Sequence, residues 1–229
     1  MSAFFDYPQA AAFGRVLPKS KIYEHVNAST KVKQLFVDQV DRITWAYKLA
    51  PETTNLETSK AVAEIQIFRI VLRVAEIDEN ILIAIDKAIP FPIIFELNHK
   101  AKRKAIAAYK RPSDADQAKW VVSEYFTTDW ESEDNPRHLL PSALNLEGLY
   151  ARLLEALIPD SVGADEPIGT RVERLEAIRA KQREAERIKA RLANEKQFNK
   201  RVAINAELRD MTKALKHLGG KRATKNQKG

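Results

Sequence analysis

The chain has 229 residues, 45% of them hydrophobic, and no cysteine. This length and composition can bury one core of about 150 residues and still leave an appendage, so we expect one domain with an extension. The lack of cysteine excludes disulfides and thiolate metal sites, and together with the lack of a signal-peptide pattern or a long apolar run it predicts a cytoplasmic protein that does not span a membrane.

The net charge of +7 is distributed unevenly along the chain. Residues 171–229 hold 18 Lys or Arg and 7 Asp or Glu, a net charge of +11, whereas residues 1–170 hold 20 and 24, a net charge of −4. Such a basic segment is typical of contact with nucleic acid or with an acidic protein surface, and also of a long solvated helix.

The first predicted elements lead up to a central strand at 62–72. Residues 1–20 mix aromatic residues with Pro and Gly, and we expect them to lie across the domain as an arm. Apolar residues at helical spacing predict a helix over 27–42, and the sequence ITWAYKL predicts a short strand over 43–49. Both faces of 62–72 are apolar, which places this strand inside a sheet that helices cover on at least one side.

The remaining elements complete a globular domain over 1–158. They are a helix that Asp78 caps, a pair of strands joined by a turn at Asn98–Ala101, another strand and a second helix, at 79–89, 93–98, 103–110, 119–126 and 142–158. Together these patterns predict an α+β fold: a mixed sheet of about five strands with packed helices, followed by a long C-terminal helix.

The C-terminal third predicts a helix that needs a partner. Pro and Gly gather in 159–170, which we interpret as a linker, whereas 171–218 lacks both and predicts one coiled-coil-like helix about 70 Å long, followed by a flexible basic tail over 219–229. The apolar seam changes register within NEKQFNKRVAIN, and an isolated helix of this length is not stable, so we expect it to bind a partner or a copy of itself. The residues predicted to make that contact are Glu195, Phe198, Asn199, Val202 and Leu208.

Glu64 and Gln66 are the weak candidates for catalysis. They share one face at the start of the central strand, and a carboxylate followed by a polar residue there is similar to the Mg²⁺-binding pair of restriction-type nucleases, with Asp38 or Asp41 as a second acid. Gln66 stands where those enzymes usually have Lys, and no Pro-Asp precedes the pair. The alternative interpretation is that Glu64 and Gln66 pair with neighbours at the strand end, and Mg²⁺ is expected only if the nuclease hypothesis holds.

A basic cluster near the predicted strand turn is the candidate for nucleic-acid binding. Such a cluster could hold phosphate groups; the alternative interpretation is that the lysines lie on an edge strand and keep the protein soluble. The four histidines have no ligand spacing, and nucleotide-binding and serine-hydrolase motifs do not occur, so no metal site is predicted. The cluster consists of Lys100, Lys102, Arg103, Lys104, Lys110 and Arg111.

Several sequence blocks, taken together, resemble a known family. The succession LPKSKIYEH, ITWAYKLAPETTNL, EIQIF, IDKAIPFPIIFEL, AYKRP, LEGLY and NEKQFNKRVAIN is similar to the bacterial and archaeal family called domain of unknown function 4391. The resemblance implies a gene often placed beside SNF-type helicases and DNA methyltransferases, as in restriction or phage-defence systems. It supplies no active site.

These patterns lead to one main functional hypothesis and two alternatives. The main hypothesis is a non-catalytic accessory protein of a DNA-processing or phage-defence system, which contacts a protein partner or its own copy through the C-terminal helix. The alternatives are a metal-dependent nuclease that uses Glu64, and a module that binds DNA or RNA.

Overall fold

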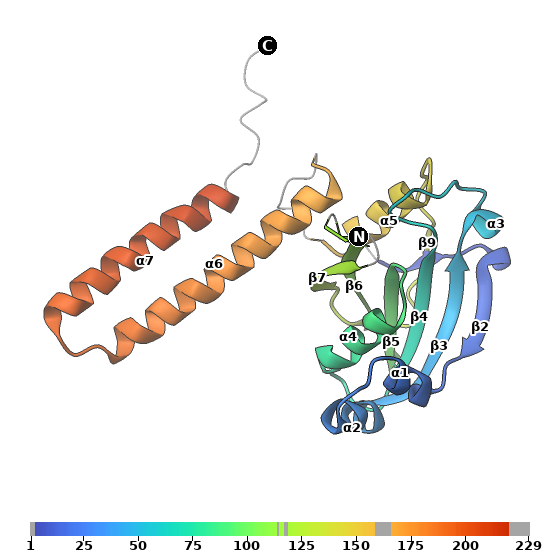
Figure 1. The fold of residues 1–229 in the computed structure, drawn as a ribbon, viewed down its shortest axis with the longest axis horizontal. Coiled ribbons are helices and arrows are strands. Elements are labelled where there is room, and N and C mark those ends of the chain that lie inside the picture. Colours follow the sequence, from blue (N-terminus) through green and yellow to red (C-terminus); the bar gives the residue numbers. More distant parts are fainter. Residues whose placement is uncertain (1–2, 114, 117–118, 159–165, 220–229) are drawn as a thin grey trace, which may run out of the picture. The chain divides into compact units, whose positions relative to one another are not determined.

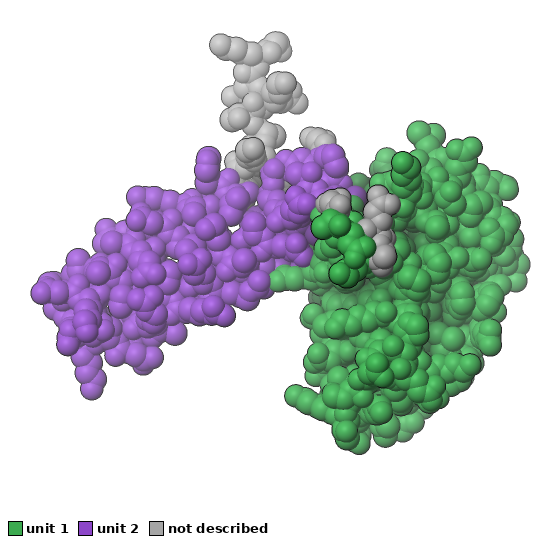
Figure 2. Space-filling view, viewed as in Figure 1, with its two compact units in different colours: residues 1–158 green, residues 159–229 purple. Residues whose placement is uncertain are grey.

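The computed structural model describes residues 3–113, 115–116, 119–158 and 166–219. The chain divides into two compact units, residues 1–158 and residues 159–229 (Figure 2). None of the helices in the described ranges has the length and apolar character needed to cross a bilayer.

The first unit is built on a mixed sheet of seven strands, which confirms the predicted α+β class with more strands than expected (Figure 1). The strand order is β2-β3-β4-β5-β6-β7, with β8 also pairing with β6, and only the β4–β5 pair is parallel among these neighbours. A second, two-stranded sheet pairs β1 with β9. The strands are β1 Phe5–Asp6, β2 Ala12–Val16, β3 Val40–Leu49, β4 Ile65–Leu72, β5 Ile93–His99, β6 Lys102–Pro112, β7 Trp120–Thr127, β8 Glu131–Ser132 and β9 His138–Leu139.

The helices of the first unit begin at side-chain caps where the sequence supplies them. The carboxylate of Asp78 accepts from the Asn80 amide at 2.9 Å, and the Asn145 side chain accepts from the Gly148 amide at 2.8 Å, so that orphan amides at the starts of α4 and α5 are satisfied. The helical segments are η1 Gln9–Ala11, α1 Lys19–His25, α2 Thr30–Gln39, α3 Pro51–Thr54, α4 Glu79–Ala88 and α5 Leu146–Glu155.

One face of the sheet is covered by α1, α2 and α4, which together bury the main core. Ile22, Phe36 and Ile85 from these helices pack over Phe68 and Ile70 of β4. Because β4 is buried along both faces and lies between β3 and β5, it occupies the central place that its sequence predicted.

The second unit corrects the predicted C-terminal helix. Instead of one helix over 171–218, the structure has two, α6 Ile168–Asn194 and α7 Phe198–Gly219, joined by the turn Glu195–Gln197 and lying side by side (Figure 1). The register change in the sequence marks this turn: on either side of it lies an apolar stripe, and folding back buries one stripe on the other. Of the predicted linker, 168–170 belong to α6 and 159–165 lie outside the described residues, as do 220–229 of the predicted tail.

Candidate functional site

Glu64 pairs with neighbours at the end of β4, as the alternative interpretation expected. One carboxylate oxygen lies 3.4 Å from the Lys48 ammonium on β3, and the other accepts from the side-chain amide of Gln66. Lys48 also donates to Glu52 at 3.0 Å, and its pKa is raised because Glu52 and Glu64 stabilise the ammonium form. The buried Gln66 amide therefore has an acceptor two residues before it in the chain.

The structure does not bring the proposed second acids to Glu64. Asp41 lies near the start of β3, opposite the last residues of β4, whereas Glu64 precedes the first, so the two acids are roughly 25 Å apart. Asp41 instead faces Arg73 at 3.3 Å, and Asp38 accepts from Gln34 within α2. Across the described ranges, no three His, Asp or Glu side chains are grouped to hold a metal ion.

The six residues of the predicted basic cluster do not share one surface, because Arg103 and Lys110 are buried. Residues alternate between the two faces of β6, so neighbouring cations point in opposite directions. Arg103 is 3% exposed: its guanidinium donates to Glu131 at 2.7 Å and lies 4.2 Å from the centre of the Phe4 ring. Lys110 is buried as well.

The other members of this cluster differ in exposure and in their contacts. Lys100, in the left-handed conformation with φ 55°, and Lys102 are exposed at the turn. Lys104 is mostly covered and lies 5.6 Å from the Trp130 ring centre, while the Arg111 guanidinium donates to the Pro112 carbonyl at 3.3 Å. Within this cluster, Lys100 and Lys102 are the exposed members, and Arg111 is half-buried.

Lys110 occupies a site in the core that the sequence patterns did not predict. Its ammonium donates to the Asp86 carbonyl at 2.6 Å and to the Ile89 carbonyl at the end of α4, and it lies 3.4 Å from the Asp86 carboxylate. The Tyr125 hydroxyl donates to the other carboxylate oxygen at 2.5 Å. Burial raises the pKa of Asp86 and lowers the pKa of Lys110, and each charge opposes the shift of the other. This network closes the C-terminal end of α4.

A second buried network, around Glu96, was also missed. Glu96 is 1% exposed in β5, and the Arg137 guanidinium donates to its two oxygens at 2.7 and 2.8 Å, while Arg69 donates at 3.2 Å. These hydrogen bonds raise the pKa of Arg137. Burial, reinforced by the charge of Glu96, raises the pKa of Tyr7. A lone carboxylate in the apolar stretch PIIFEL was the signal for this network.

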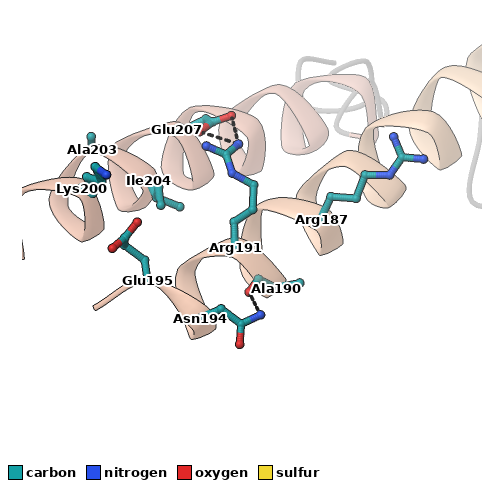
Figure 3. A pocket seen from close by; sticks show the side chains of 9 residues that line it. All are labelled: Arg187, Ala190, Arg191, Asn194, Glu195, Lys200, Ala203, Ile204 and Glu207. Atoms are coloured by element: carbon teal, nitrogen blue, oxygen red, sulfur yellow. Dashed lines mark hydrogen bonds and ion pairs between the residues drawn. The ribbon is translucent and has the colours of Figure 1, made fainter. Parts of the chain in front are cut away.

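The hairpin of α6 and α7 is the remaining candidate site. Ala185 and Ile188 of α6 and Ile204 of α7 are buried in its seam. Beside the seam, the Arg191 guanidinium donates to both oxygens of Glu207 at 3.4 Å and so bridges the two helices (Figure 3). Next to this bridge is an open groove of about 690 Å³, lined by Arg187, Ala190, Arg191, Asn194, Glu195, Lys200, Ala203, Ile204 and Glu207.

The five predicted partner-binding residues divide between the turn, the seam and the surface. Glu195 accepts from the Gln197 amide at 2.8 Å, and this bond lowers the pKa of its carboxyl. Leu208 is half-buried four residues after Ile204, so it belongs to the seam. Asn199 is exposed, and Phe198 and Val202 are 77% and 50% exposed one helical turn apart at the start of α7. We call these two the apolar tip of the hairpin.

Comparison with known proteins assigns a family to this arrangement. The family model described as domain of unknown function 4391 matches residues 5–215. The chain belongs to this family. The match covers both the mixed sheet and most of the hairpin, so the two units are parts of one family architecture. No curated protein and no solved structure matches the chain.

Proposed function

We propose that this protein is a non-catalytic accessory protein that docks on a protein partner through the apolar tip of its hairpin. The observation that carries the proposal is the exposure of Phe198 and Val202 on one side of the first turns of α7. Aromatic residues are enriched in the centres of protein interfaces. Neighbouring apolar side chains contribute most to the binding free energy when a partner removes them from water.

The chemistry of the first unit supports a role without catalysis. Both oxygens of Glu64 and both oxygens of Glu96 accept hydrogen bonds or ion pairs from neighbouring side chains. A carboxylate that is saturated in this way orders the structure around it rather than exchanging a proton with a substrate. Lys110 and Asp86 likewise pair with each other, and Lys110 donates to a carbonyl near the end of α4.

The biological setting is the part of the proposal that rests on the family resemblance alone. We propose that the partner belongs to a DNA-processing or phage-defence assembly of the cytoplasm. In this setting the first unit carries the hairpin, and the apolar tip of the hairpin contacts the partner. The turn favours this use because Glu195 fixes its backbone and limits the ordering cost on binding.

The test compares proteins captured by the tagged full-length chain from cells of its source. Three forms are used: the wild type, the tip variant Phe198→Ser/Val202→Ser, and a control variant Val16→Ser/Val37→Ser, whose valines are 55% and 53% exposed in the first unit. We expect one partner to be retained by the wild type and the control and lost by the tip variant.

Light scattering on the purified forms completes the test. A dimer that only the tip variant fails to form identifies a second copy of the chain as the partner. Identical captured proteins for all three forms, together with identical masses in solution, would refute docking by the tip.

A further inference from the structure

The outer flank of α7 carries a stripe of hydrogen-bond donors without a carboxylate. Five residues recur at spacings of three or four along this helix, and at about 100° per residue they share one side. Four of them are exposed, and Asn205 is half-buried. The stripe consists of Arg201, Asn205, Arg209, Thr212 and Lys216.

The carboxylates of α7 lie on another side of the helix. Glu207 faces α6, where it pairs with Arg191, and Asp210 lies 3.6 Å from Lys213. At about 100° per residue, both carboxylates are more than about 130° from the centre of the stripe. Charge is thus separated around the helix, so the stripe remains cationic.

The three cations of the stripe are available for an external anion. Arg201, Arg209 and Lys216 are exposed, and within the described ranges no ion pair engages any of them. Elsewhere in the hairpin an exposed cation does have an acid partner, as Lys189 has Glu186 three residues before it on α6. The stripe lacks that arrangement.

The spacing of the cations fits a regular array of negative charges. Arg201 and Arg209 are about 12 Å apart along the axis, and Lys216 lies about 10 Å further on. Each strand of a double helix has a phosphate about every 3.4 Å of axis, so each strand carries about six phosphates over the length of the stripe. A rigid helix meets such an array without ordering a flexible segment, and Asn and Thr side chains add neutral donors to phosphate oxygens.

We propose that this flank of α7 binds the phosphate backbone of double-stranded nucleic acid. The proposal goes beyond docking by the apolar tip, because protein docking does not require a cationic stripe. It uses residues other than those of the predicted basic cluster, in which Arg103 and Lys110 are buried. Contacts to phosphates alone predict binding that is independent of sequence and sensitive to salt.

The test measures the fluorescence anisotropy of a labelled 20-base-pair duplex, DNA or RNA, with the full-length protein over a series of salt concentrations. The stripe variant is Arg201→Gln/Arg209→Gln/Lys216→Gln. The control variant, Arg187→Gln/Lys196→Gln/Lys200→Gln, removes the same charge from the groove side and the turn of the hairpin. Gln preserves helix propensity, and circular dichroism verifies that both variants keep the helicity of the wild type.

We expect the stripe variant to bind about tenfold or more weakly at low salt, with the control within about threefold of the wild type. The slope of log affinity against log salt concentration should fall by about 0.9 for each lost phosphate contact, hence by two to three units for the stripe variant. Equal losses in the two variants, no binding by the wild type at low salt, or displacement of the duplex by polyglutamate as effectively as by unlabelled duplex would each overturn the proposal.

Discussion

Replacing Lys110 by Met tests whether the buried network at the end of α4 holds the first unit together. Met keeps most of the length and volume of the lysine stem, so the substitution removes the charge without opening a large cavity. It leaves the Asp86 carboxylate, whose residue is 5% exposed, with the Tyr125 hydroxyl as its remaining hydrogen-bond donor. It also removes the donor to the carbonyls of Asp86 and Ile89.

The expected loss of stability in Lys110→Met is large because the Asp86 carboxylate stays buried without its cationic partner. Breaking such a pair costs about 3–5 kcal/mol, and for a chain of this size each kcal/mol lowers the melting temperature by about 2–4 °C. The Lys110→Met variant should therefore melt roughly 6–20 °C below the wild type. Adding Asp86→Asn removes the unpaired charge and keeps an acceptor for Tyr125, so the double variant should recover about 2 kcal/mol of the loss.

The three tryptophans make the assay specific for this unit, since all of them lie within residues 1–158. Urea and thermal unfolding followed by their fluorescence give the change in free energy. Lys102→Met, an exposed position on the same strand, serves as the control and should shift stability by less than about 0.5 kcal/mol. A shift this small for Lys110→Met, or a double variant less stable than the single one, would refute the reasoning.

The stability deficit of Lys110→Met should also depend on pH. Burial raises the pKa of Asp86 and Lys110 lowers it, so the substitution raises the folded-state pKa further above the unfolded value of about 3.9. A raised acid binds more protons when folded, so the variant loses stability as pH rises from about 4 through the folded pKa. The deficit relative to the wild type should be smaller at about pH 4.5 than at about pH 8, and a pH-independent deficit would contradict this assignment.

Three further predictions address the other sites. Glu96→Gln should lower the free energy of unfolding by about 3 kcal/mol, measured by urea unfolding, because Arg137 loses a bidentate ionic partner; a change below about 0.5 kcal/mol would contradict the role given to this network. Ile188→Ala should lower the free energy of unfolding of the hairpin, followed by circular dichroism, by about 2–4 kcal/mol, while the unfolding of the first unit, followed by tryptophan fluorescence, stays unchanged. If both signals are lost together, the two units unfold together. Glu64→Ala should leave DNA unaffected both with Mg²⁺ and with EDTA, and should cost about 1–3 kcal/mol because the buried Gln66 amide loses its acceptor; Mg²⁺-dependent cleavage that the variant lacks would instead favour the nuclease hypothesis.

Local patterns predicted five of the seven strands of the sheet, but not β2, which lies in the predicted arm, or the two-residue β8. The two apolar faces of 62–72 indicated the central position of β4, and the turn at Asn98–Ala101 joins β5 to β6 with Lys100 in the left-handed conformation. Asp78 caps α4 as predicted. These features depend on residues within a few positions of one another, where periodicity and capping chemistry are informative.

The partners within the buried networks could not be predicted from the sequence, because they come from distant segments. Glu96 meets Arg137 across 41 positions, and Lys110 meets Asp86 across 24. The basic neighbours of Lys110 in the sequence predict a surface cluster, yet the alternation of β6 turns its side chain into the core. The same limit applies to the hairpin: the change of register located the break in the helix, but not the reversal of direction.

That reversal ties the lengths of the two C-terminal helices to each other. Seven residues inserted into α6 alone would expose two turns of new apolar seam, whereas seven inserted into each helix would lengthen the hairpin and carry Phe198 outward by about 10 Å. Relatives with a longer or shorter hairpin should therefore differ by paired heptads on the two sides of Glu195–Gln197. The length of the hairpin, and with it the position of its tip, would then change among relatives in steps of two helical turns.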